Sequence, residues 1–95
     1  MSQEAPNLAD LVEFPAELPM KAISHKDVPH EEFHAAVKEL AVLHITAFKE
    51  EWISVRTSSG GSFISVTLSA TYQSADEVNA LDTALRAHPL VKMVM

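Results

Sequence analysis

The sequence predicts a two-layer α+β domain whose elements follow the order strand, helix, strand, strand, helix, strand. Apolar and polar residues alternate, the period of a strand, in four segments, and apolar residues recur every three or four positions, the period of a helix, in two others. The two central strand segments flank the run from Ser58 to Ser62, which is typical of a hairpin turn. This βαββαβ order is the ferredoxin-like arrangement, a four-stranded antiparallel sheet with both helices on one face, and we expect the spatial strand order 4-1-3-2.

The first strand and helix follow from residue spacing near the start of the pattern. We expect a strand over residues 18–24, with Met20 and Ala22 on the core face and Lys21 and Ile23 on the other. Asp27 and Pro29 predict the start of a helix that runs to about residue 45. Its apolar stripe is expected to contain these residues: Phe33, Ala36, Val37, Leu40 and Leu43.

The second half of the chain repeats the pattern. A strand over residues 51–57 is expected to turn Ile53 and Val55 inward and Trp52, Ser54 and Arg56 outward. The next strand alternates strictly, with one apolar face, from Ile64 to Tyr72, and one face that is almost entirely hydroxyl-bearing. A capping box from Ser74 to Glu77 predicts a helix from about Ala75, which His88-Pro89 ends. Residues 90–95 form the last expected strand, with Val91, Met93 and Met95 on one face.

These periodicities together predict one hydrophobic core. Its expected members come from all four strands and both helices: Met20, Phe33, Val37, Leu40, Ile53, Val55, Ile64, Val66, Leu68, Val78, Leu81, Leu85, Val91 and Met93.

Length and composition limit the organisation and the partners. The 95 residues suit a single domain over residues 18–95 after a loose arm over residues 1–17, which carries Pro6, Pro15 and a short turn near residues 8–12. The net charge of −6 argues against binding of nucleic acid through an extended basic surface. The absence of cysteine, of a signal peptide and of a long apolar stretch predicts a cytoplasmic protein with no membrane association.

Several short motifs resemble those of a known family. The chain is similar to the YbeD-like family of small bacterial proteins over nearly all its length from about residue 8. The similarity is carried by four segments: Glu13-Phe14-Pro15, Ser58-Ser59-Gly60-Gly61 before an aromatic residue, Ser65-Val66-Thr67-Leu68 and Val91-Lys92-Met93-Val94-Met95. The resemblance implies a ferredoxin-like fold with an architecture similar to ACT-type sensing domains, in a cytosolic protein whose biochemical role is unassigned. It implies no catalytic residues.

One segment matches a zinc-binding pattern. The run from His30 to His34 reads H-E-x-x-H, in which two histidines one helical turn apart bind zinc and a glutamate, here Glu31, acts as general base. The extended form of the motif fails because Leu40 stands where a third histidine is required. We therefore interpret His30 and His34 as surface residues at a helix start, with a zinc-dependent enzyme or metal binder as the alternative, and we expect no cofactor.

The second candidate is the sheet face opposite the helices. The cations Lys21, Arg56 and Lys92 are expected there with the following aromatic and hydroxyl residues: Trp52, Phe63, Ser65, Thr67 and Ser69. Such a face could satisfy a carboxylate or phosphate, and ferredoxin-like RNA readers stack bases on aromatic residues of the equivalent face. The pattern favours a non-catalytic regulatory or adaptor domain that binds a protein partner or a small, anionic ligand and forms a homodimer through an edge strand or the open face. An RNA-binding module is the second alternative.

Overall fold

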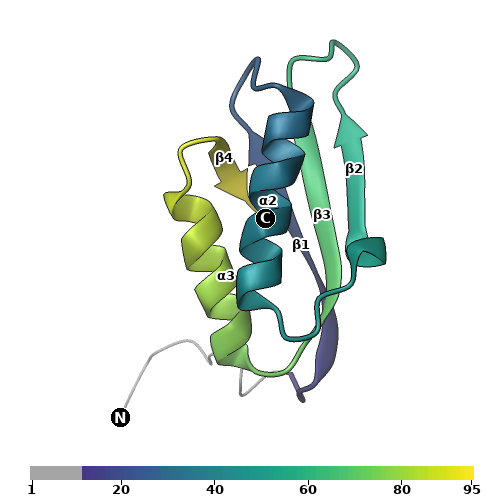
Figure 1. Cartoon of the computed structure of the whole chain (residues 1–95), viewed down its shortest axis with the longest axis vertical. Helices are drawn as coiled ribbons and strands as arrows, with labels where there is room; N and C mark the ends of the chain where they lie inside the picture. Colours follow the sequence, from purple (N-terminus) through teal and green to yellow (C-terminus); the bar gives the residue numbers. More distant parts are fainter. Residues whose placement is uncertain (1–11) are drawn as a thin grey trace.

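The computed structural model describes residues 12–95 and confirms the βαββαβ arrangement (Figure 1). Its elements, in chain order, are β1 (Ala16–Ser24), α2 (His30–His44), a short 3-10 helix (Glu50–Trp52), β2 (Ile53–Thr57), β3 (Ile64–Tyr72), α3 (Ala75–Ala87) and β4 (Val91–Val94). The antiparallel sheet has the order β2-β3-β1-β4, which is the predicted order read from the other edge. The first strand begins at Ala16, two residues earlier than predicted, and residues 1–11 of the expected arm lie outside the described part of the chain.

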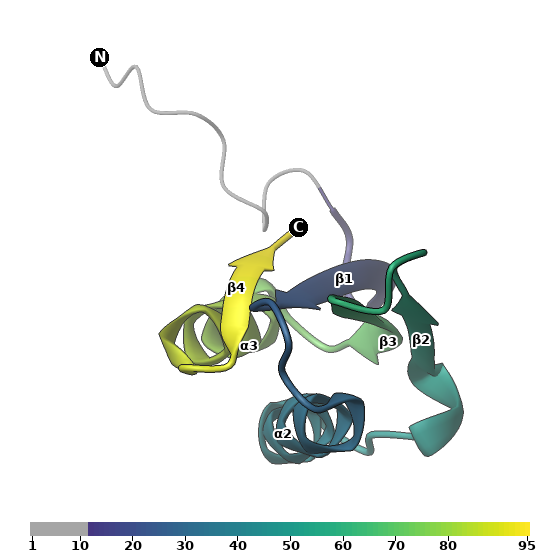
Figure 2. The ribbon, with the colours of Figure 1, turned by 90° about the horizontal axis from the view of Figure 1, so that it is seen from above.

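Both helices cover the same face of the sheet, and the core lies between the two layers (Figure 2). The predicted alternation in β3 is confirmed, because Ile64, Val66, Leu68, Ala70 and Tyr72 are all buried. Helix α2 contributes a stripe at four-residue spacing, and α3 contributes Leu81 and Leu85. Six buried residues were not among the predicted core members: Ala22, Ala41, Ile45, Ala70, Tyr72 and Val94.

Three apolar residues assigned to inward faces are exposed. Val55 is 47% exposed because β2 is an edge strand that extends beyond the helical layer (Figure 1). Leu43 is 73% exposed. It lies roughly 120° round α2 from Val37, which is buried. Met93 is 46% exposed, and its prediction failed because β4 does not alternate regularly.

The irregularity in β4 is a bulge. Ile23 pairs with Met93 and Ser24 pairs with Val91, so Lys92 is the extra residue opposite that step of β1. The bulge breaks the two-residue period and lets Val91 and Val94 both face the core. A strict alternation read from the sequence could not anticipate this.

Local hydrogen bonds explain where the helices start. Ser74 accepts a hydrogen bond from the backbone N–H of Glu77 at 3.2 Å, as the capping box predicts, and α3 ends before the cap residue His88. The start of α2 differs from the prediction in detail. Asp27 has φ 63° in the preceding turn, and Pro29 occupies the cap position with no side-chain hydrogen bond. Within residues 12–95 no helix combines the length and apolarity needed to cross a bilayer.

Candidate functional site

The sheet face away from the helices gathers the cations and hydroxyls that the sequence placed there. In the strand register, Ser54, Thr67 and Lys21 form one row across β2, β3 and β1. Arg56, Ser65 and Ile23 form the next row. Each of these residues alternates with core-facing neighbours, so all project from the open side. We call this surface, comprising Lys21, Ser54, Arg56, Ser65, Thr67 and Ser69, the hydroxyl face.

Two adjoining hollows lie on the hydroxyl face. The first has a volume of about 180 Å³ and lies at the hairpin end of the sheet; its lining includes Ile23, Ser58 and Phe63. The second has a volume of about 300 Å³ and is bounded by the hydroxyl face itself. Both hollows are lined by Lys21, Arg56 and Ser65, so two positive side chains from different strands border the same concave surface.

These cations are not neutralised by neighbouring carboxylates of the described residues. The ion pairs within residues 12–95 join Lys38 to Glu50 and Arg86 to Asp82, and neither pair involves the hydroxyl face. Glu17 shares the open side but lies four residues from Lys21 along β1, which corresponds to about 13 Å. Although the chain as a whole carries a charge of −6, this face therefore combines positive charge with hydroxyl donors.

Two residues that were predicted to belong to the site, Trp52 and Lys92, do not line the hollows. Trp52 was expected to project outward from β2, but that interpretation is wrong: residues 50–52 form a 3-10 turn, and the indole packs against the core. Its ring meets Phe48 edge-on at a centroid distance of 5.9 Å, and Lys49 Nζ lies 5.8 Å from its centroid. Lys92 does not line the hollows, but its Nζ lies 5.6 Å from the centroid of Phe63, which does.

The aromatic content of the open side is accordingly small. Phe63 lines a hollow, whereas the other aromatic residues of the described chain are in the core or packed against it: Phe14, Phe33, Phe48, Trp52 and Tyr72. Strand β3 presents serines and threonines where RNA readers of this fold present stacking rings.

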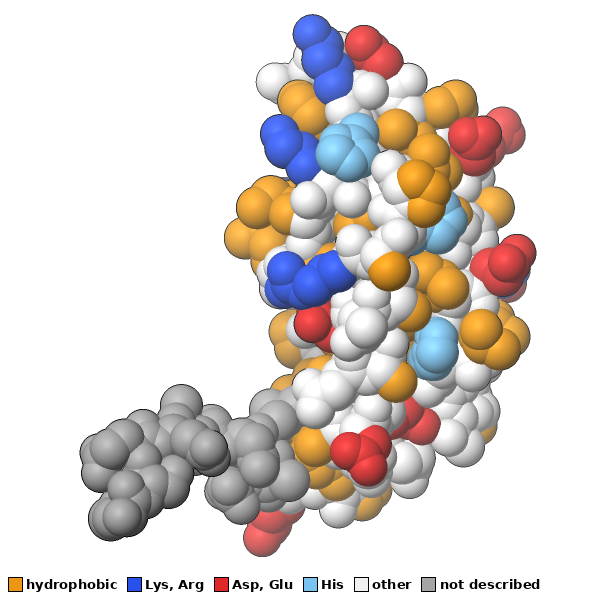
Figure 3. All heavy atoms as spheres, turned by 90° about the vertical axis from the view of Figure 1, so that its left-hand side faces the viewer, with side chains coloured by type: hydrophobic (Ala, Val, Ile, Leu, Met, Phe, Trp, Pro, Cys, Tyr) orange, Lys and Arg blue, Asp and Glu red, His pale blue; other side chains and the backbone are white. Residues whose placement is uncertain are grey.

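Figure 3 shows the side of the molecule that carries β4 and α3, where most of the Lys and Arg side chains in view lie on the half nearer the sheet.

The hairpin between β2 and β3 forms one wall of the first hollow and is held by defined contacts. Ser58 Oγ accepts from the N–H of Phe63 at 3.1 Å, and the N–H of Ser58 donates to the Phe63 carbonyl at 2.9 Å. Gly61 adopts φ 75°, a left-handed conformation that favours glycine. The N–H of Asp27 donates to the Ser62 carbonyl at 2.8 Å, which ties the hairpin to the loop before α2. The segment is the predicted β-hairpin, and its contribution of Ser58 to a hollow was not anticipated.

The H-E-x-x-H residues make a structural contact in this arrangement. His30 Nε2 donates to the carbonyl of Gly61 at 3.3 Å, which fixes the hairpin against the first turn of α2. Within residues 12–95 the structure brings together no group of three or more histidine, cysteine, aspartate or glutamate side chains able to hold a metal ion. The third ligand missing from the motif is therefore not supplied by another described segment.

A second polar cluster is centred on Glu77 and joins three segments at the end of α2 and the start of α3, away from the β2–β3 hairpin. Its carboxylate accepts from the N–H and the hydroxyl of Thr46 at 3.2 and 2.7 Å and from the N–H of Gln73 at 2.9 Å. Partial burial acts to raise the pKa of Glu77, but these hydrogen bonds outweigh it and hold the pKa below its usual value. Burial, together with the charge of Glu77, raises the pKa of Tyr72 to about 12. The cluster joins the loop after α2 to the start of α3, and none of its residues lines either hollow.

The fold and this face define a small ferredoxin-like α+β domain with one sheet surface that the described residues leave uncovered. The chain belongs to the family described as Protein of unknown function (DUF493), whose model matches residues 9–95. The YbeD-like resemblance is thereby confirmed.

The relatives are similar in length as well as in sequence. A UPF0250 protein from Chromobacterium violaceum is 33% identical over 86 residues, which cover 90% of this chain and 93% of the relative. A UPF0250 protein from Leptothrix cholodnii is 32% identical over 93 residues, covering 98% and 99% of the two chains. One from Neisseria gonorrhoeae is 32% identical over 92 residues, covering 97% and 98%. No solved structure matches the chain significantly.

Proposed function

We propose that this chain is a non-catalytic regulatory domain that binds an anionic group, a carboxylate or a phosphate, on the hydroxyl face. The observation that carries the proposal is the concave surface where Lys21 and Arg56, contributed by β1 and β2, border the same hollows. A sheet face needs no cation for stability, and neither residue is paired with a carboxylate of the described chain.

The neighbouring groups suit an oxyanion. The hydroxyls of Ser54, Thr67 and Ser69 line the larger hollow together with the two cations and can donate hydrogen bonds to several oxygens at once. Arginine adds a planar pair of donors that matches carboxylate and phosphate geometry, and lysine adds a point charge. Hydrogen bonds that involve a charged partner are stronger than neutral ones, which gives a small surface hollow useful affinity.

Among residues 12–95, the hydroxyl face presents no groups arranged for catalysis. Its side chains are cations, hydroxyls and the Phe63 ring, and its lining includes neither histidine nor carboxylate to act as a general base. The proposal is therefore one of binding, and the likeness to ACT-type sensing domains is one of architecture alone.

The proposal is tested by titrating the protein with inorganic phosphate, with citrate and with a short glutamate-rich peptide, and following backbone amide shifts by NMR. We expect saturable shifts centred on Ser65 and Thr67. The variant Arg56→Glu should weaken binding at least tenfold, since it replaces an attraction by a repulsion.

The matched control is Lys49→Glu, which changes the net charge equally at a lysine that lies over Trp52 and away from the hollows. Equal weakening by both variants would show a general effect of charge and would remove the hydroxyl face as the site. Shifts with the peptide alone would assign the face to an acidic partner segment, whereas shifts with the small anions would assign it to a metabolite. An absence of shifts with all three probes would overturn the proposal.

A further inference from the structure

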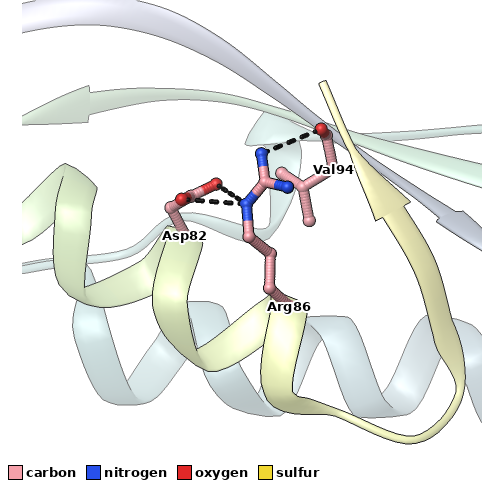
Figure 4. A network of polar contacts seen from close by, with 3 residues as sticks. All are labelled: Asp82, Arg86 and Val94. Carbon is pink, nitrogen blue, oxygen red and sulfur yellow. Dashed lines mark hydrogen bonds and ion pairs between the residues drawn. The ribbon is translucent and has the colours of Figure 1, made fainter.

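The two edges of the sheet differ in how well they are protected. The β4 edge is short, and the bulge at Lys92 interrupts its pairing with β1. Arg86 reaches from α3 and donates to the carbonyl of Val94 at 3.2 Å, while Asp82 holds the guanidinium through its Nε at 3.0 Å (Figure 4). Bulges and charged side chains at an edge are devices that prevent pairing with another strand, so the β4 edge is closed to a further strand.

The β2 edge presents free backbone groups instead. Ser58 N–H donates to the Phe63 carbonyl, and the Arg56 carbonyl accepts from the Ser65 hydroxyl, so residues 54, 56 and 58 direct their backbone groups toward β3. Because these directions alternate along a strand, Ile53, Val55 and Thr57 direct theirs toward the free edge. The N–H of Ile53 is used by the carbonyl of Glu50, whereas the outward groups of Val55 and Thr57 face no other strand of residues 12–95, because β2 is the edge strand.

The side chains of β2 also lack the usual protection. The strand contains neither proline nor a bulge, and its one charged residue, Arg56, lies on the hydroxyl face. Val55 projects to the other side, where it is 47% exposed beyond the edge of the helical layer. Unpaired backbone groups beside an exposed apolar side chain are the features of a strand that accepts a partner strand.

We propose that a second copy of this chain pairs with β2 in antiparallel orientation, with Val55 opposite Val55 on the two-fold axis. This register brings edge-facing residues together. Val55 exchanges two hydrogen bonds with its counterpart, and Thr57 N–H donates to the carbonyl of Ile53 on each side. It uses the whole length of β2, Ile53–Thr57, and buries the exposed Val55 pair on the core side.

Charge favours this register over its neighbours. With Val55 on the axis, Arg56 lies opposite Ser54 of the second copy. A shift that centres the pair on Arg56 would place two arginines directly opposite each other, which is unfavourable. A shift that centres it on Ser54 would pair only residues 53–55 of the strand and leave Thr57 unbonded. The strand is therefore self-complementary in one register.

The dimer joins two four-stranded sheets into one continuous sheet whose two hydroxyl faces lie on the same side. Ser54 of each copy then adjoins Arg56 of the other, so the two sets of hollows meet at the axis. The pairing itself rests on the edge of β2 and is independent of the anion proposal.

The test is the molar mass by light scattering after gel filtration, from about 5 μM to about 500 μM, where dimerisation depends on concentration. We expect twice the chain mass of 10.4 kDa at the upper end. Val55→Pro removes an edge-facing N–H without removing a bond to β3, and should weaken the dimer at least tenfold. Val55→Lys should do the same by placing two like charges on the axis. The control is Leu43→Lys, because Leu43 is 73% exposed on α2 and lies about 140° round the helix from Lys38, which binds Glu50 next to β2.

Hydrogen exchange supplies a readout at single residues. The amides of Val55 and Thr57 should gain protection as the protein concentration rises, whereas those of Ser54 and Arg56, bonded to β3, should be protected throughout. A chain mass of 10.4 kDa at every concentration would overturn the proposal. A dimer that survives both Val55 variants, or unchanged exchange at Val55 and Thr57, would place the interface elsewhere and would equally overturn it.

Discussion

The hydrogen bonds of Glu77 lead to a quantitative prediction about stability. The carboxylate accepts hydrogen bonds from two donors of Thr46 and one of Gln73. It therefore joins the loop that follows α2 to the start of α3. Glu77→Gln keeps the size of the side chain but replaces one acceptor oxygen by an N–H₂ group. The amide can satisfy either Thr46 or Gln73 but not both, so at least one backbone N–H loses its partner.

The expected cost is about 1.5 kcal/mol at neutral pH, the lower end of the range for hydrogen bonds to a charged group, because the site is only partly buried. For a domain of this size that corresponds to a fall in melting temperature of about 6 to 12 °C. The control is Asp76→Asn in the same first turn. Asp76 is exposed and has no side-chain hydrogen bond to the described residues, so this variant removes only the favourable interaction with the helix dipole, about 0.5 kcal/mol.

The same contact predicts a pH dependence. The folded protein has the lower pKa for Glu77, so the unfolded chain binds the proton first as the pH falls. The contribution is complete above the ordinary glutamate pKa of about 4.3 and is lost as the pH falls through the folded value. Urea unfolding of the wild type and both variants between about pH 7 and about pH 2 measures this. A cost for Glu77→Gln no greater than that of Asp76→Asn, or a difference from wild type that persists undiminished to the lowest pH, would refute the reasoning.

Two further predictions concern the backbone. Gly61→Ala should cost about 1 kcal/mol because its φ of 75° is strained for a residue with a Cβ, whereas Gly60→Ala, with open space around it and no such φ, should be close to neutral; equal melting temperatures for the two variants would contradict this. Ser24→Ala should cost about 1 to 2 kcal/mol, because the buried Ser24 Oγ accepts from the N–H of Ile64 at 3.1 Å and its removal leaves that buried N–H without this acceptor. Denaturant unfolding measures that cost, and an unchanged midpoint would show that the contact contributes nothing.

The architecture follows from periodicity because each element buries one face. The strict alternation of β3 and the capping box before α3 are local patterns, and the structure reproduces both. The pairing order also follows, since a hairpin joins β2 to β3 and the fold class dictates the rest. Local pattern does not report which strands lie at an edge, and this explains why Val55 was assigned to the core.

The hydroxyl face was predicted in composition but not in geometry. The sequence predicted that four residues share the side away from the helices, because side chains alternate between the two faces of a strand: Lys21, Arg56, Ser65 and Thr67. Trp52 was misplaced because a 3-10 turn over Glu50–Trp52 precedes β2, so the strand begins at Ile53, two residues later than expected. Ile23, Thr57 and Ser58 were missed as lining residues, since their proximity depends on the register between strands.

The sequence by itself determined the order of elements, the faces of the regular strands and the caps of α3, because these depend on interactions between residues close along the chain. Tertiary structure decided three other features: the bulge that turns Met93 outward, the hollows between Lys21 and Arg56, and the contrast between a closed and an open sheet edge. Each depends on the register and cover supplied by segments distant in sequence. The physical reason is that the face of the sheet to which a side chain points is set by its position within its own strand. Its neighbours across the sheet are set by how the strands pair.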